Sequence, residues 1–177
     1  YRDYWKEDWR EGNPAFIDKE NNDWEGNYKV HYWEKEWQKI ILERVQWIAE
    51  QGYTGVYLDI IDAYYYYQEK GMESAAQEMV DFVRRISNEG KKQSPSFLVV
   101  PQNSPELYAY KMYKDAIDGL GKEDTWFIGD ELKNVKDQAY ELQFLMRVLG
   151  DGKFVLAIDY PTTRENVCEF YYHCQRK

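Results

Sequence analysis

From Gly52 onward, short apolar runs alternate with polar or aromatic loops and with stretches of helical periodicity. The apolar runs cover residues 55–59, 97–100, 117–121 and 154–159. Continuous apolar runs of this length are typical of strands that are buried on both faces of a parallel sheet. The alternation of strands and helices therefore predicts a parallel α/β fold, either a doubly wound sheet or a β/α barrel.

The helical stretches show apolar stripes and recognisable ends. One stripe at helical spacing precedes Gly52, where a C-terminal glycine stop is expected, and it consists of Ile41, Val45 and Ile48. Ser104 followed by Pro105 is typical of a helix start and predicts a short helix that runs to about residue 114. We interpret these stripes as core faces.

Length and charge exclude several classes of protein. A chain of 177 residues suits one domain, so we expect residues 1–177 to form a single unit. The formal net charge of −9 argues against duplex nucleic acid as the main partner and favours a neutral or cationic ligand. No apolar run reaches the roughly 18 residues that span a bilayer, and residues 1–10 do not resemble a signal peptide.

The sequence predicts neither a cofactor nor a metal. Gly119 and Gly121 are not followed by the third glycine of a dinucleotide-binding loop. Cys168 and Cys174 lie six residues apart in a predicted helix, which is not a metal-ligand spacing. No serine or cysteine elbow motif accompanies the histidines, which argues against a nucleophilic triad.

Residues 1–32 differ from the rest of the chain because aromatic side chains alternate there with acids and show no regular period. The rings in this segment are Tyr1, Tyr4, Trp5, Trp9, Trp24, Tyr28 and Tyr32. Long segments without secondary structure are commonly functional in compact domains. We therefore expect an aromatic, acidic loop on the rim of the fold.

In parallel α/β folds the ligand binds at the carboxyl ends of the strands, so the residues that follow each strand are the candidates for a site. They are acids, amides and rings: Asp59, Asp62 and Tyr64 to Tyr67 after the first run, Gln102 and Asn103 after the second, Glu123 and Trp126 after the third, and Asp159 and Tyr160 after the fourth. Sugars present apolar faces that dock onto rings and hydroxyls that bond to amides and carboxylates, so this set suits a carbohydrate.

Two facing carboxylates are what the cleavage of a glycosidic bond requires. Asp59 and Glu123 come from strands separated by one strand and can face a common ligand. Each also has an ordinary structural interpretation: Asp59 can cap the following loop, and Asp62 can shape it. Glu131 lies in a polar turn before a helix, where an exposed helix-start acid is the usual interpretation, and it remains a substitute for the second carboxylate.

Four segments resemble the signature segments of glycoside hydrolase family 114, the endo-α-1,4-polygalactosaminidases and related barrel proteins. They are W-E-K-E-W-Q at 33–38, G-Y-T-G-V-Y-L-D-I-I-D-A-Y at 52–64, V-P-Q-N at 100–103 and I-D-G-L-G-K-E-D at 117–124. The second segment is specific and the others are moderately so. Some members have been labelled as related to cysteinyl-tRNA synthetase, but no H-I-G-H or K-M-S-K-S type of sequence occurs here.

The resemblance implies a (β/α)8 TIM barrel, of which this chain holds the middle and later part. It also implies that Asp59 is the catalytic aspartate and that Glu123 stands where a catalytic glutamate follows the sixth strand, although the family often has N-E there instead of K-E-D. The implied activity is cleavage within a galactosamine-type polysaccharide, outside the cell or in its envelope. We assign substrate binding to Asp62, Tyr64, Gln102, Asn103, Trp126, Glu131, Asp159 and Tyr160.

For the mechanism we expect Glu123 to be the general acid/base, with a raised pKa, and Asp59 to be the nucleophile, although the roles can be exchanged. Two other functions are compatible with the sequence. One is a carbohydrate-binding barrel without catalysis, and the other is a scaffold domain whose acidic rim engages a basic protein.

Overall fold

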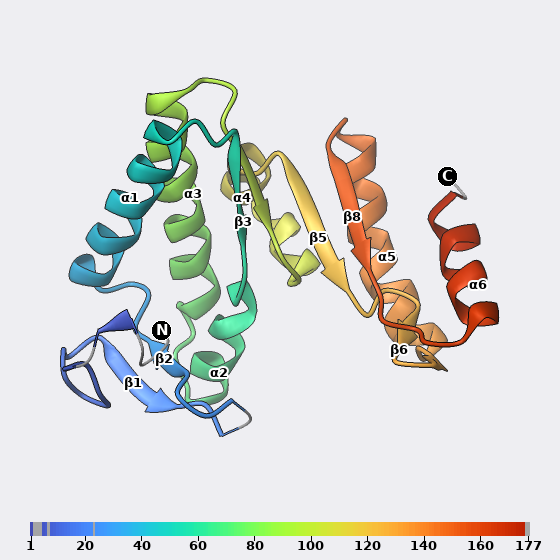
Figure 1. The fold of residues 1–177 in the computed structure, drawn as a ribbon, viewed down its shortest axis with the longest axis horizontal. Helices are drawn as coiled ribbons and strands as arrows, with labels where there is room; N and C mark the ends of the chain where they lie inside the picture. The colour runs from blue at the N-terminus through green and yellow to red at the C-terminus, as the bar shows by residue number, and fades with distance from the viewer. Residues whose placement is uncertain (2–4, 7, 23, 176–177) are drawn as a thin grey trace.

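The computed structural model describes residues 1, 5–6, 8–22 and 24–175 (Figure 1). Four short parallel strands lie side by side in the order β3, β4, β5, β8, and the helices α1, α3, α4 and α5 pack along them. The strands are β3 (Gly55–Leu58), β4 (Leu98–Pro101), β5 (Gly119–Glu123) and β8 (Phe154–Ile158). The four predicted strands are thus confirmed to within a few residues.

The helices follow the predicted apolar stripes. The α-helices are α1 (Lys35–Glu50), α2 (Tyr64–Glu69), α3 (Ala75–Gln93), α4 (Lys111–Ala116), α5 (Val135–Gly150) and α6 (Arg164–Gln175), with 3-10 turns η2 (Ile61–Ala63) and η3 (Pro105–Ala109). One helix start differs from the prediction. Ser104 has a left-handed φ of 50° and makes no cap hydrogen bond, so η3 replaces the first part of the expected helix.

The strands pair as β3 with β4 and as β5 with β8, and the two pairs meet between β4 and β5. A parallel bridge joins Gln102 to Gly121, and the Asp118 backbone amide donates to the Val99 carbonyl at 2.9 Å. Within the described residues the strands form no closed sheet. The fold is therefore a mixed α/β fold in which strands and helices alternate, and the TIM barrel expected from the resemblance is not confirmed.

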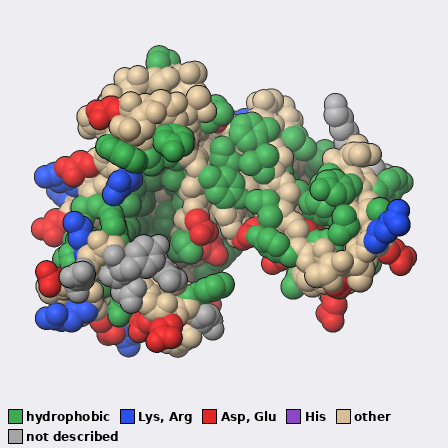
Figure 2. Space-filling model, viewed as in Figure 1, with side chains coloured by type: hydrophobic (Ala, Val, Ile, Leu, Met, Phe, Trp, Pro, Cys, Tyr) green, Lys and Arg blue, Asp and Glu red, His purple; other side chains and the backbone are tan. Residues whose placement is uncertain are grey.

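The core lies between the strands and α3. Val80 and Val83 of α3, Phe97 and Val99 at the start of β4, and Leu120 of β5 are fully buried. On the other face of the strands, apolar side chains remain partly exposed. Tyr57, Leu98, Phe154 and Leu156 belong to this open face, over which Figure 2 shows hydrophobic side chains gathered.

The segment 1–32 is a correction to the sequence prediction. It contains an antiparallel pair of strands, β1 (Ile17–Glu20) and β2 (Tyr28–Val30), and not a loop throughout. Several of its rings pack together and onto α1, with centroid distances of 5.2 Å for Trp9–Phe16 and 6.1 Å for Trp5–Trp37. The lack of a regular period suggested a loop, but aromatic rings pack together without any regular spacing in the sequence. Tyr4 lies outside the described residues.

A second antiparallel pair, β6 (Phe127–Ile128) and β7 (Glu131–Leu132), connects β5 to α5. Among the helices of the described part of the chain, none has both the length and the apolar character that crossing a bilayer requires.

The contact between α3 and the start of β4 gives a stability prediction. A Cβ atom built at Gly90 would lie 2.2 Å from Cδ1 of Phe97, whose ring is fully buried and cannot move aside. Because overpacking a core costs about 1–3 kcal/mol, we expect Gly90→Val to lower the free energy of unfolding by that amount. Urea denaturation measures the change.

The matched control is Gly150→Val at the end of α5, where a Cβ meets nothing within 4 Å. We expect its free energy of unfolding to stay within about 0.5 kcal/mol of the parent, as for most exposed substitutions. Equal stability of the two variants would contradict the packing account.

Candidate functional site

The candidate site lies where the parallel strands end. Side chains alternate between the two faces of a strand, so Asp59 follows Tyr57 on the open face of β3, and Glu123 follows Gly121 on the same face of β5. A Cβ at Gly121 would lie 2.1 Å from the Tyr57 hydroxyl oxygen. Glycine at position 121 therefore leaves room for the Tyr57 ring, which reaches from β3 to β5.

The Glu123 carboxylate accepts hydrogen bonds from residues of two neighbouring strand exits. Gln102 donates to Oε2, Tyr160 donates to Oε1, and Asn103 Nδ2 lies 3.3 Å from Oε2. The Asn103 side chain also accepts from the Glu123 backbone amide at 3.1 Å. These donors, above all Tyr160, hold the pKa of Glu123 below its usual range, and partial burial opposes them. The raised pKa expected from the sequence is therefore wrong, because the neighbours stabilise the ionised form.

Acidic side chains surround Glu123 in a polar cleft of about 250 Å³. The carboxylates that line it are those of Asp62, Glu106, Glu123, Asp124 and Glu141. Figure 2 shows acidic side chains near the carboxyl ends of the strands. An acidic cleft of this kind attracts cations and disfavours anions.

Asp62 differs from Glu123 in its electrostatics. Although the residue as a whole is exposed, desolvation raises the pKa of its carboxyl, and its own backbone amide opposes this shift. The charges of Asp59, Glu123 and Glu106 raise the pKa further. Like-charged carboxyls that lie close together cannot all ionise easily. The cleft therefore contains two carboxyls whose pKa values shift in opposite directions, lowered at Glu123 and raised at Asp62.

Backbone strain is concentrated at the strand exits. Among the described residues other than glycine, a positive φ occurs at Ile60, Asn103, Ser104 and Asp124, each within three residues of the end of a strand. Such conformations cost about 1–3 kcal/mol each and cluster at functional sites. The left-handed backbone at these strand exits therefore supports placing the site there.

The structure brings some predicted residues to the cleft and leaves others elsewhere. Gln102, Asn103 and Tyr160 contact Glu123 directly, and Asp62 lines the cleft. Asp59 is exposed at the end of β3, and its Oδ1 accepts the Ile60 amide at 2.7 Å, as the loop-capping interpretation expects.

Two predicted sugar-docking rings are used in packing. Tyr64 is buried and donates to Glu106, so its face is not available as a platform. Trp126 stacks on His173 of α6 with a centroid distance of 5.6 Å and an interplanar angle of 8°. Neither ring lines the cleft, whereas the half-exposed Tyr65 does.

Two further acids that the sequence assigned to the site do not line the cleft. Asp159 accepts the backbone amides of Thr125, Trp126 and Phe127 at 2.6–2.8 Å, so it holds the loop after β5. Glu131 is exposed in β7 and does not line the cleft. The structure thus gives Asp159 a structural role and does not bring Glu131 to Glu123.

Sequence reasoning missed three residues of the site. Tyr57 stands two positions before Asp59 in the same strand, so the two-residue period of a strand could have placed it on the same face. Glu106 accepts from Tyr64 and from Tyr65, the latter at 2.5 Å, but its sequence position suggested only a helix start. Lys122 is buried behind Glu123, which no local pattern indicates.

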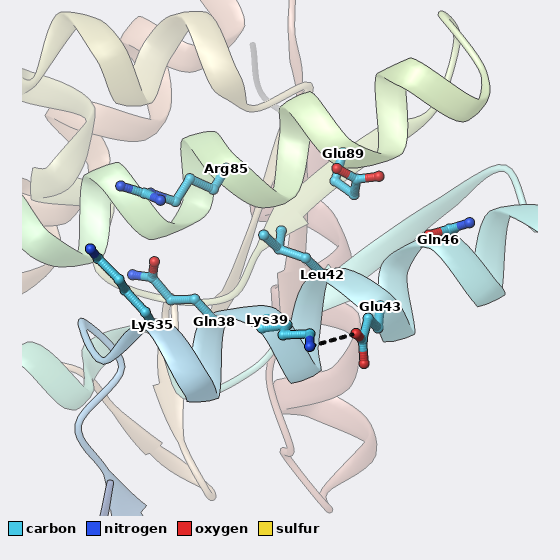
Figure 3. Close-up of a pocket in the computed structure, with 8 residues that line it drawn as sticks. All are labelled: Lys35, Gln38, Lys39, Leu42, Glu43, Gln46, Arg85 and Glu89. Atoms are coloured by element: carbon cyan, nitrogen blue, oxygen red, sulfur yellow. Dashed lines mark ion pairs between the residues drawn. The ribbon is translucent and has the colours of Figure 1, made fainter.

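A larger cavity of about 390 Å³ lies between α1 and α3 (Figure 3). It is lined by the charged residues Lys35, Lys39, Glu43, Arg85 and Glu89, with Gln38, Gln46 and Leu42. Lys39 and Glu43 pair there at 3.8 Å. The cavity lies on the helical side, away from the strand exits, and we therefore place the function in the smaller cleft.

Known proteins resemble this chain in sequence and in fold. The family model described as "Glycoside-hydrolase family GH114" matches residues 2–177. An uncharacterized protein of Methanocaldococcus jannaschii is 37% identical over 166 residues, covering 90% of this chain and 48% of that protein. One from Thermotoga maritima is 32% identical over 165 residues, covering 90% and 51%. The chain therefore spans about half the length of these relatives.

Two solved structures share the fold. The glycoside hydrolase domain of PelA from Pseudomonas aeruginosa aligns with a TM-score of 0.70 and 18% identity, covering 89% of this chain and 62% of that one. Aspergillus fumigatus Ega3, solved in complex with galactosamine, aligns with a TM-score of 0.65 and 17% identity, covering 86% and 55%.

The hydrogen bond from Tyr160 gives a prediction for the Glu123 carboxyl. Tyr160→Phe removes the donor that contributes most to lowering the pKa of Glu123, so we expect this pKa to rise. Carboxyl ¹³C NMR titration measures it. Tyr171→Phe, at an exposed ring of α6, is the control and should leave the Glu123 titration unchanged. An unaltered titration in Tyr160→Phe would show that the contact does not hold the carboxylate.

Proposed function

This chain belongs to glycoside hydrolase family GH114, and from that premise we propose that it cleaves internal bonds of an amino-sugar polysaccharide of the galactosamine type. The observation that carries the proposal is the Glu123 carboxylate, held by Gln102, Asn103 and Tyr160 at the edge of an acidic cleft. Hydrolysis of a glycosidic bond needs one ionised and one protonated carboxyl, and the cleft has groups suited to each state.

The substrate class is supported by charge. A partly deacetylated galactosamine polymer is cationic, and the carboxylates of the cleft would attract it and raise its local concentration. Ega3, which shares the fold, was solved with galactosamine bound. We further propose that the protein acts outside the cell or in its envelope. We also propose that its four parallel strands form part of a β/α barrel.

For the mechanism we propose the exchanged roles. Glu123, whose donors stabilise its ionised form, acts as the nucleophile or as the base that activates water. We assign the proton for the leaving oxygen to the carboxyl pair of Asp59 and Asp62. Burial and the neighbouring acids raise the pKa of Asp62, which favours its protonated form. Tyr57 orients the ligand, since burial, followed by the charges of Glu123 and Asp59, raises the pKa of its hydroxyl and keeps it a donor.

A reducing-end assay on a galactosamine polymer tests the function. We expect Glu123→Gln and Asp59→Asn each to lower the rate by about 10² or more, the usual scale for a lost acid or base. Asp115→Asn, at an exposed aspartate paired with Lys111, is the control and should keep the parent rate. Polymer binding by the parent without new reducing ends would favour a carbohydrate-binding protein instead.

The pH profile separates the two proton donors. The alkaline limb of kcat/KM reports the group that must be protonated, and the acid limb reports Glu123. Because burial and the neighbouring carboxyls raise the pKa of Asp62, we expect Asp62→Asn to remove the alkaline limb or move it, while the acid limb stays. If Asp59→Asn alone alters the alkaline limb, Asp62 is not the proton source.

A further inference from the structure

A charged network lies behind Glu123, on the face of β5 that packs against α5. Lys122 Nζ lies 3.5 Å from Glu141 Oε2, and Lys133 Nζ lies 2.5 Å from the same oxygen. The side chains of the two lysines are only 8% and 9% exposed, and that of Glu141 is 20% exposed. Burying charges is costly unless each is paired, so the arrangement requires all three partners.

Each lysine also reaches a backbone carbonyl at the β5 exit. Lys122 donates to the Glu123 carbonyl, and Lys133 donates to the Asp124 carbonyl at 2.9 Å. These two carbonyls flank the backbone of Asp124, whose φ of 49° is unfavourable for a residue with a side chain. Thr125 adds a bond from its hydroxyl to the Lys122 carbonyl at 3.0 Å. The network thus binds the strained turn on both sides.

We propose that Lys122, Lys133 and Glu141 are positioning residues, which hold the β5 exit in its left-handed turn and so direct the Glu123 carboxylate toward Gln102, Asn103 and Tyr160. The inference rests on the proposed role of Glu123. Lys122 and Glu141 also line the cleft, so the network forms its wall on the α5 side. Lys122 has a second effect, since its positive charge lowers the pKa of Glu123.

Lys122 acts on Glu123 through its charge as well as through the network, whereas Lys133 belongs to the network alone. A network with a purely structural role would therefore leave the Glu123 titration unchanged when Lys133 is replaced. The charged and titratable groups around Glu123 come from every neighbouring element: Tyr57, Asp59 and Asp62 from the β3 side, Glu106 from η3, Tyr160 after β8, Glu141 from α5, and Lys122 and Asp124 from β5 and its exit. Of these, Lys122 is the cation.

The test replaces Lys122 by Met, which keeps the length of the side chain and removes its charge and its donor. We expect the titration midpoint of Glu123, followed by carboxyl ¹³C NMR, to rise by about half a unit or more. We expect kcat on the galactosamine polymer to fall about 10- to 100-fold, the scale of a misplaced catalytic group, while KM changes little. The acid limb of the pH profile should move to higher pH in parallel.

Lys153→Met is the matched control because Lys153 donates to the Ile117 carbonyl at 2.6 Å, next to the other end of β5. It should leave the Glu123 titration and kcat at the parent values. Lys122→Arg, which keeps the charge, should restore much of both. Lys133→Met keeps the Lys122–Glu141 pair and its charge but removes the bond to the Asp124 carbonyl. We expect it to raise the Glu123 midpoint as well, which the loss of the Lys122 charge cannot explain, and it also serves if Lys122→Met does not fold.

A Glu123 titration in the Lys133 variant that equals those of the parent and the Lys153 variant would overturn the proposal. The titration needs no substrate and is therefore independent of the proposed activity. If the parent protein releases no reducing ends, only the proposed function is contradicted. The titration midpoint of Glu123 then still decides whether the network positions Glu123.

Discussion

The site depends on the junction between β4 and β5. The two parallel pairs meet through the Gln102–Gly121 bridge and through the Asn103 amide, which donates to the Gly121 carbonyl at 2.8 Å. This register places the amides that follow β4 directly beside the carboxylate that ends β5. A shift by one residue would turn Glu123 toward the helices, because successive side chains point to opposite faces of a strand.

Glycine at position 121 makes this junction compatible with an aromatic ring. Tyr57 from β3 crosses to β5, and its hydroxyl oxygen lies within 2.1 Å of where a Cβ of residue 121 would be. One residue without a side chain therefore connects the packing of three strands to the position of Glu123. The same close approach brings Tyr57 under the influence of both catalytic candidates.

The strand exits combine unfavourable backbone conformations with closely spaced acids. Asp124 and Asn103 adopt left-handed φ values, and Glu123 and Asp62 share one cleft. Each arrangement lowers stability, and the surrounding structure offsets the cost through paired charges, amide donors and a buried core. Such a concentration of locally unfavourable features is expected where a protein binds or reacts, because function, and not stability, favours them there.

Local patterns in the sequence determined the strands, most of the helices and the position of the acids at strand ends, because the periodicity of apolar residues follows directly from strand and helix geometry. The resemblance carried by residues 52–64 indicated the family. Only the tertiary structure decided which side chains meet. Trp126 packs on α6, Asp159 holds a loop, and several rings of the first 32 residues pack against one another. The ionisation of Glu123 also depends on donors that lie 21 and 37 residues away in sequence, Gln102 and Tyr160, and no local pattern specifies them.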